Sequence, residues 1–106
     1  MSFETQLIDL GTVQKGEVRE MSIPFENSGN MPFMIELVTS CNCTSLEWPV
    51  AKVFQPGEGG VIEAIFDSTE KEKSETVDID IILRENDPKT GYPKIFTVQF
   101  KFILEE

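Results

Sequence analysis

Histidine is absent from this sequence of 106 residues. It is the commonest general base in enzymes, so no Ser-His-Asp or Cys-His nucleophilic site can be built from this chain. The glycine-rich segment at residues 57–60 also lacks the lysine and the following helix that a phosphate-binding loop requires. We therefore expect no catalytic residue and no cofactor, and a protein that is not an enzyme.

Basic residues are scarce, with nine Lys and Arg against 19 Asp and Glu and a formal net charge of −10. Such a charge repels phosphate backbones and anionic lipid surfaces. No apolar run approaches the roughly 18 residues of a membrane-spanning helix. We expect neither nucleic acid binding nor membrane insertion, and instead a protein partner or a second copy of the chain.

No basic or apolar leader follows Met1, so the sequence as printed carries no export signal. This predicts a cytoplasmic or virion protein, or an extracytoplasmic one if a leader has been trimmed. Hydrophobic residues make up 40% of the chain and include eight Phe, which is enough apolar material for a core at this length. We expect residues 1–106 to form a single domain without a metal or disulfide scaffold.

Hydrophobic residues recur with a period of two in short segments bounded by Gly, Pro, Asn and Asp, which is typical of an antiparallel sandwich. Because the last two segments are apolar on one face and polar on the other, we expect them at the centre of a sheet. The seven predicted strands cover residues 5–10, 18–26, 33–38, 45–48, 61–67, 76–84 and 95–104. The predicted core consists of Ile23, Phe25, Ile62, Phe66, Ile79, Ile81, Phe100 and Phe102.

Several short motifs occur in a fixed order along the chain. They are Lys-Gly-Glu at residues 15–17, Asn-Ser-Gly at 27–29, Cys-Asn-Cys-Thr at 41–44, Pro-Gly at 56–57 and Phe-Asp at 66–67. Over roughly residues 3–104, this order resembles a bacterial immunoglobulin-like domain family of unknown function with a Cys-Gly-Cys-Thr loop. That family is related to major sperm protein and ASH-type domains. Asn42 stands where the family usually has glycine.

The resemblance implies an all-β, immunoglobulin-like, seven-stranded antiparallel sandwich that serves as an adhesive or scaffolding module. It transfers no catalytic residues to this chain. Fold-level likeness does not by itself fix a function.

Cys41 and Cys43 are the sharpest local feature of the sequence. Such a pair can bind a soft metal through its thiolates or form a disulfide, although so short a ring is strained. A structural zinc site needs four ligands, and two cysteines supply half of them. The interpretation that we favour is packing, in which one cysteine is buried as a small apolar side chain. The disulfide or redox role and the metal site stay open as alternatives.

The lone Trp48 and the lone Tyr92 are the candidate partner-binding residues. A single Trp in an immunoglobulin-like domain usually covers the core, and this is the interpretation that we favour for Trp48. The alternative is an exposed anchor for a partner. Tyr92 lies near the tip of the predicted final hairpin and raises the same choice.

Together these features predict a non-enzymatic module for protein binding or assembly, in which strand edges and loops dock a partner. One alternative is a virus-encoded structural protein, such as a head decoration or tail subunit. The other is a metal-binding or redox module centred on Cys41 and Cys43.

Overall fold

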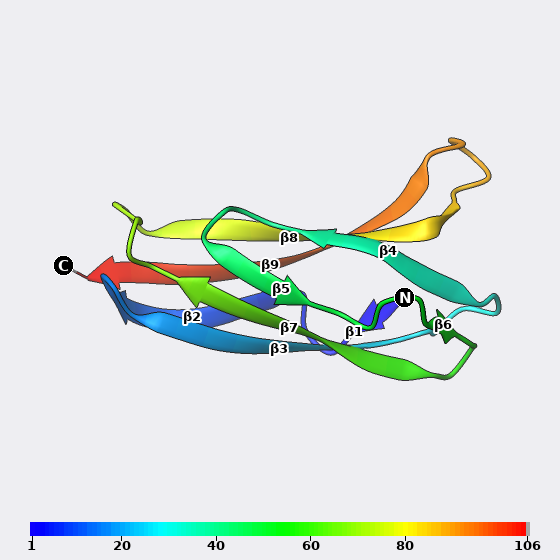
Figure 1. The fold of residues 1–106 in the computed structure, drawn as a ribbon, viewed down its shortest axis with the longest axis horizontal. Helices are drawn as coiled ribbons and strands as arrows, with labels where there is room; N and C mark the ends of the chain where they lie inside the picture. Colours follow the sequence, from blue (N-terminus) through cyan, green and yellow to red (C-terminus); the bar gives the residue numbers. More distant parts are fainter. Residues whose placement is uncertain (106) are drawn as a thin grey trace.

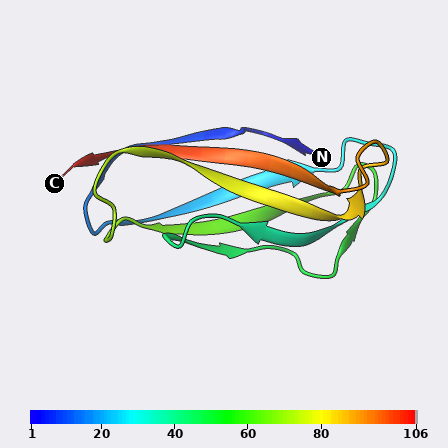
Figure 2. The ribbon, with the colours of Figure 1, turned by 90° about the horizontal axis from the view of Figure 1, so that it is seen from above.

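The alternating segments form two stacked β-sheets in the computed structural model, which describes residues 1–105 (Figures 1 and 2). The four-stranded sheet has the order β1 (Ser2–Phe3), β3 (Val18–Glu26), β7 (Gly59–Asp67) and β5 (Thr44–Glu47). The five-stranded sheet has the order β2 (Leu7–Gln14), β9 (Pro93–Glu105), β8 (Glu75–Asn86), β4 (Phe33–Thr39) and β6 (Val53–Phe54). Strands β8 and β9 lie inside the five-stranded sheet, as their alternation predicted.

The predicted all-β sandwich is confirmed, and the structure adds detail to its strands. Two further strands of two residues each, β1 and β6, extend opposite sheets. The first long strand does not end at Leu10 as predicted but continues to Gln14. Gly11 has a φ of +68° and its N–H donates to Asp9 Oδ1, so the chain passes through an irregularity and resumes pairing.

The expectation of purely antiparallel sheets is wrong at one position. Strand β2 pairs with β9 in parallel, with Leu7 opposite Gln99 and Val13 opposite Leu104. Parallel neighbours need a long crossover between them, and here almost the whole chain provides it. Strand direction is set by this long-range pairing, which local alternation does not encode.

The core lies between the sheets and contains all eight residues predicted for it, each 4% exposed or less. Phe66 of the four-stranded sheet packs against Phe100 and Phe102 of the five-stranded sheet, with ring centroids 5.1 and 4.8 Å apart. These aromatic contacts join the two layers at their centre. They bury large apolar areas, which is the main favourable contribution to folding.

Among residues 1–105, two polar side chains are buried near the core, and both are hydrogen-bonded. Ser68 Oγ donates to the Glu17 carbonyl at 2.7 Å and accepts the Gly16 N–H at 3.0 Å. Asn27 Nδ2 donates to the carbonyls of Met31 and Phe54. Each side chain therefore fixes a loop onto the sandwich without an unsatisfied polar group.

Candidate functional site

Strand β5 forms one edge of the four-stranded sheet, and it follows the loop that holds Cys41 and Cys43 (Figure 1). It pairs antiparallel with β7, and Thr44 lies opposite Phe66. Just before this pair, the Asp67 N–H donates to the Cys43 carbonyl at 2.9 Å. Since hydrogen-bonded and non-hydrogen-bonded pairs alternate along an antiparallel ladder, Thr44 and Phe66 form a non-hydrogen-bonded pair.

This register decides which main-chain groups of β5 are free. The N–H and C=O groups of Ser45 and Glu47 point toward β7, and those of Leu46 point away from it. No other strand within residues 1–105 pairs with β5 on that side. Leu46 therefore presents a donor and an acceptor at an open sheet edge, which is a template for a further strand.

The outward face beside this edge is acidic. Glu20 of β3, Glu63 of β7 and Glu47 of β5 come together there around Ile65, because the register places Ile65 between Glu20 and Ser45. These residues line a shallow depression of about 260 Å³, to which no Lys or Arg contributes. Such a surface favours cationic groups on whatever approaches it.

The opposite lateral side of the sandwich, where β2 faces β3, is closed by an arginine. Arg19 donates to the carbonyls of Leu10 and Thr12 on β2, at 3.3 and 3.1 Å. Its Nε also bonds the carboxylate of Glu17. This hydrogen bond lowers the pKa of Glu17 below its ordinary value, with a further contribution from the Gln14 N–H. The β2 edge is thus occupied by a side chain, whereas the outer side of β5 pairs with no strand in the described part of the chain.

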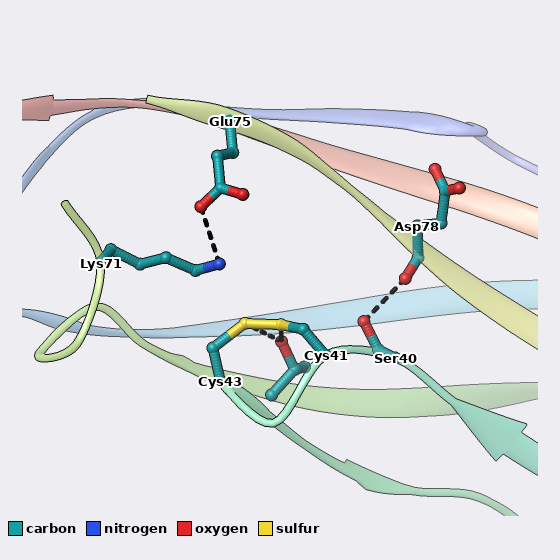
Figure 3. The surroundings of a disulfide bond; sticks show 7 residues. Ser40, Cys41, Cys43, Lys71, Glu75 and Asp78 are labelled. Atoms are coloured by element: carbon teal, nitrogen blue, oxygen red, sulfur yellow. Dashed lines mark hydrogen bonds and ion pairs between the residues drawn. A yellow bond between two sulfur atoms is a disulfide. The ribbon is translucent and has the colours of Figure 1, made fainter. Parts of the chain in front are cut away.

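Cys41 and Cys43 are joined by a disulfide in the structure (Figure 3). The Thr44 N–H donates to the Cys41 carbonyl at 3.2 Å, and this turn brings the two cysteine Cα atoms to 5.2 Å. That separation lies within the range that a disulfide bridges. Both cysteines are half-buried and pack against the rim of the core. The packing that we favoured, with one cysteine buried as a small apolar side chain, is therefore not found; the structure has the disulfide that was one of the alternatives, because the turn brings the two sulfurs together.

The disulfide lines an open pocket of about 460 Å³ together with Asn42, Asp67, Thr69, Glu70 and Lys71. Figure 3 shows Lys71 paired with Glu75 on one flank of the disulfide, at 2.8 Å. Hydrogen bonds from Thr69 lower the pKa of Asp67, which keeps this carboxylate ionised.

Within residues 1–105, no group of three or more His, Cys, Asp or Glu side chains is placed to hold a metal ion. Cys41 and Cys43 could take a metal only after reduction, since a disulfide sulfur is not a thiolate. No helix in this part of the chain is long and apolar enough to span a membrane.

The two aromatic candidates lie on different segments of the fold. Trp48 directly follows β5 and packs half-buried against the core, and its Nε1–H is buried without an acceptor. Tyr92 lies in the loop between β8 and β9 and is 73% exposed. The structure therefore does not bring them into one site, and a role for Tyr92 in partner binding stays a prediction.

Sequence reasoning missed the acidic face and the open edge of β5. Alternation does place Glu63 and Ile65 on the outer face of their strand, and this signal was available. The approach of Glu20 and Glu47 from two other segments depends on strand order, which the sequence pattern does not give.

A family model described as "Protein of unknown function (DUF1573)" matches residues 1–98. No curated protein matches the chain. A solved protein of unknown function from Porphyromonas gingivalis W83 is similar, with a TM-score of 0.71 and 25% identity over 94% of this chain. The chain spans 44% of that protein's length.

Two other solved structures show the same fold. The ASH/PapD-like domain 7 of human CEP192 has a TM-score of 0.71 and 11% identity, covering 99% of this chain and 84% of the domain. SSP-19, an MSP-domain protein like family member in Caenorhabditis elegans, has a TM-score of 0.63 and 10% identity, covering 97% and 99%. The resemblance to a family of unknown function, and to ASH-type and major sperm protein domains, is confirmed.

Proposed function

Because the chain belongs to the DUF1573 family of proteins of unknown function, its own surface has to indicate its role, and we propose that it is a non-enzymatic protein-binding module. In this proposal, an extended basic segment of a partner protein adds as a strand alongside β5. The proposal rests on the main chain of Leu46, which has no strand partner within residues 1–105 and lies beside an acidic face.

Main-chain pairing supplies the affinity in this binding mode, and alternate side chains supply the specificity. A strand beside β5 places every second side chain on the outward face, next to Ser45 and Glu47. Lysine or arginine at those positions meets Glu47 and Glu63. The overall charge of −10 adds long-range attraction for a basic partner.

The structural neighbours support this proposal only through their fold, since ASH/PapD-like and MSP domains share the sandwich. No feature of the surface favours the virus-encoded alternative, which stays a prediction.

The proposal is tested with a short synthetic peptide of alternating lysine and valine, titrated into the isotopically labelled chain. We expect amide chemical-shift changes centred on β5, and slower hydrogen exchange at the Leu46 amide once the peptide is bound. A glutamate-valine peptide of the same length should not bind. Shifts centred on another part of the molecule, or equal binding of both peptides, would contradict the proposal.

A charge-reversal variant locates the interaction. Glu47→Lys with Glu63→Lys should weaken peptide binding about tenfold, because attraction becomes repulsion at the edge. The matched control is Glu72→Lys together with Glu70→Lys, which makes the same change in net charge on the loop between β7 and β8. If the control weakens binding equally, the attraction is not specific to β5.

A further inference from the structure

The disulfide differs from one whose role is only to stabilise the folded state. It joins cysteines only two positions apart, so it closes a very small loop and removes little conformational freedom from the unfolded chain. It also lines an open pocket, and neither cysteine is fully buried. Disulfides that are strained or exposed are the ones that exchange readily with external thiols.

A hydroxyl group is placed to assist such an exchange. Thr44 Oγ1 lies 3.4 Å from the sulfur of Cys41 and 3.4 Å from the sulfur of Cys43. A disulfide sulfur carries no proton, so the hydroxyl is the donor, and its one proton can be directed to either sulfur. Whichever sulfur leaves as a thiolate, the same hydroxyl can donate to it, and a hydrogen bond to a charged group is stronger than one to a neutral group.

The charges around the pocket select among thiols. Asp67 and Glu70 contribute two carboxylates, whereas the ammonium group of Lys71 is neutralised by Glu75. The side chains that line the pocket are therefore negative on balance, and they favour neutral or cationic thiols over anionic ones.

We propose that the Cys41–Cys43 disulfide is a redox site that exchanges with a neutral or cationic dithiol, either a small molecule or a pair of protein thiols. One thiolate of the dithiol attacks a cysteine sulfur, a mixed disulfide forms, and the electron pair of the broken bond goes to the other cysteine sulfur. The second thiol loses its proton to water and attacks the dithiol sulfur of the mixed disulfide, so that the bond to the cysteine breaks and its electron pair stays on the cysteine sulfur. The dithiol ends as a disulfide, and Cys41 and Cys43 have gained its two electrons.

This inference goes beyond the proposed binding function, since it assigns a covalent chemistry to the loop before β5. The exchange is stoichiometric, with one disulfide reduced in each chain. The two proposals also fail separately, because the peptide titration requires no cysteine chemistry.

The test is to equilibrate the folded chain with mixtures of reduced and oxidised dithiothreitol, block free thiols with N-ethylmaleimide, and measure the intact mass. We expect one transition between a chain with no label and a chain with two labels, while the far-ultraviolet circular dichroism stays that of the folded protein. Two labels at every mixture, or reduction only in urea that unfolds the chain, would overturn the proposal. The Cys41→Ser, Cys43→Ser double variant should take no label and should still bind the lysine-valine peptide.

A variant at Thr44 separates assistance from mere packing. Thr44→Val should slow reduction by dithiothreitol about tenfold, because the departing thiolate loses its hydrogen bond. Thr44→Ser keeps the hydroxyl and should restore the rate. Equal rates for Thr44→Val and the parent chain would remove Thr44 from the mechanism.

The charge selection has its own measurement. At low salt, cysteamine should react about tenfold faster than 2-mercaptoethanesulfonate after correction for thiol pKa, and the ratio should fall as salt is added. A ratio that favours the anionic thiol would overturn the assignment of the substrate class.

Discussion

The two lateral sides of the sandwich treat their strand edges differently. On the β2–β3 side, Arg19 occupies the carbonyls of Leu10 and Thr12, so a side chain stands where another strand could pair. On the β4–β5 side, no strand within residues 1–105 pairs with the outward main-chain groups of Leu46, and the edge borders an acidic face. Both sides belong to one fold and share one core.

Open edges are a hazard for β-proteins because they invite pairing with other chains, and proteins usually protect them. In this fold, the β2 edge is therefore protected and the β5 edge is left open. The acidic residues around β5 repel another copy of this acidic chain while they attract a basic one. The open side is accordingly the one on which we place the partner.

A substitution in the core that both sides share should lower stability more than any substitution at the edges. Phe100→Ala should lower the free energy of unfolding by about 3–5 kcal/mol, since the truncation loses buried area and leaves a cavity. Phe100 is fully buried against Phe66. A denaturant titration measures this, with the exposed neighbour Lys101→Ala as the control that should change little. Equal losses would mean that the inward face of β9 is misassigned.

Replacing Arg19 on the β2–β3 side should cause the next largest loss of stability. Arg19→Ala should cost about 1–2 kcal/mol, because two main-chain carbonyls lose a charged donor at a partly exposed position. Arg84→Ala is the matched control, since this arginine is exposed and its guanidinium donates to the Met34 sulfur at 3.7 Å rather than to a main-chain carbonyl. If both variants lose the same stability, the hydrogen bonds of Arg19 do not stabilise the β2 edge, and the contrast between the two sides is not supported.

The smallest expected effect is the loss of the Arg19–Glu17 interaction in acid. Arg19 lowers the pKa of Glu17 in the folded state. The resulting stabilisation is fully present above the ordinary glutamate pKa of about 4.3, and it is lost as the pH falls through the lower folded-state value. Glu17→Gln should therefore lose less stability than the parent chain between about pH 6 and about pH 3.

This comparison is measured by chemical denaturation at several pH values. Glu72→Gln serves as the control, because it removes an exposed carboxylate from a loop. An acid response of Glu17→Gln that matches the parent chain would show that the pair with Arg19 does not contribute.

The core could be predicted from the sequence because it depends on local alternation alone. Ile79 and Ile81 face inward for the same reason that Asp78 and Asp80 face outward, where they accept hydrogen bonds from β9. The same pattern places Arg19 at an inward position on its strand, with Met21 and Ile23. A charged side chain at an inward position needs hydrogen-bond partners, so the sequence did indicate that Arg19 binds polar groups between the sheets.

The candidate site could not be predicted because it depends on strand order and turn geometry. Glu20, Glu47 and Glu63 lie on three strands, and only the pairing of β3, β7 and β5 brings them together. The sequence likewise gives the spacing of Cys41 and Cys43 but not the turn that points both sulfurs the same way. Each feature is set by contacts between distant residues or by loop conformation.

The parallel pairing of β2 and β9 determines how the domain responds to mechanical tension. The N-terminal end of β2 and the C-terminal end of β9 lie at opposite ends of this pair (Figure 1). A pull applied at Leu7 and Glu105 therefore slides one strand along the other and loads the hydrogen bonds between them together rather than one after another. A strand pair loaded in shear resists stretching better than one that is peeled apart. Tension applied between residues 7 and 105 is therefore borne by this strand pair, which also carries the core residues Val13, Phe100 and Phe102.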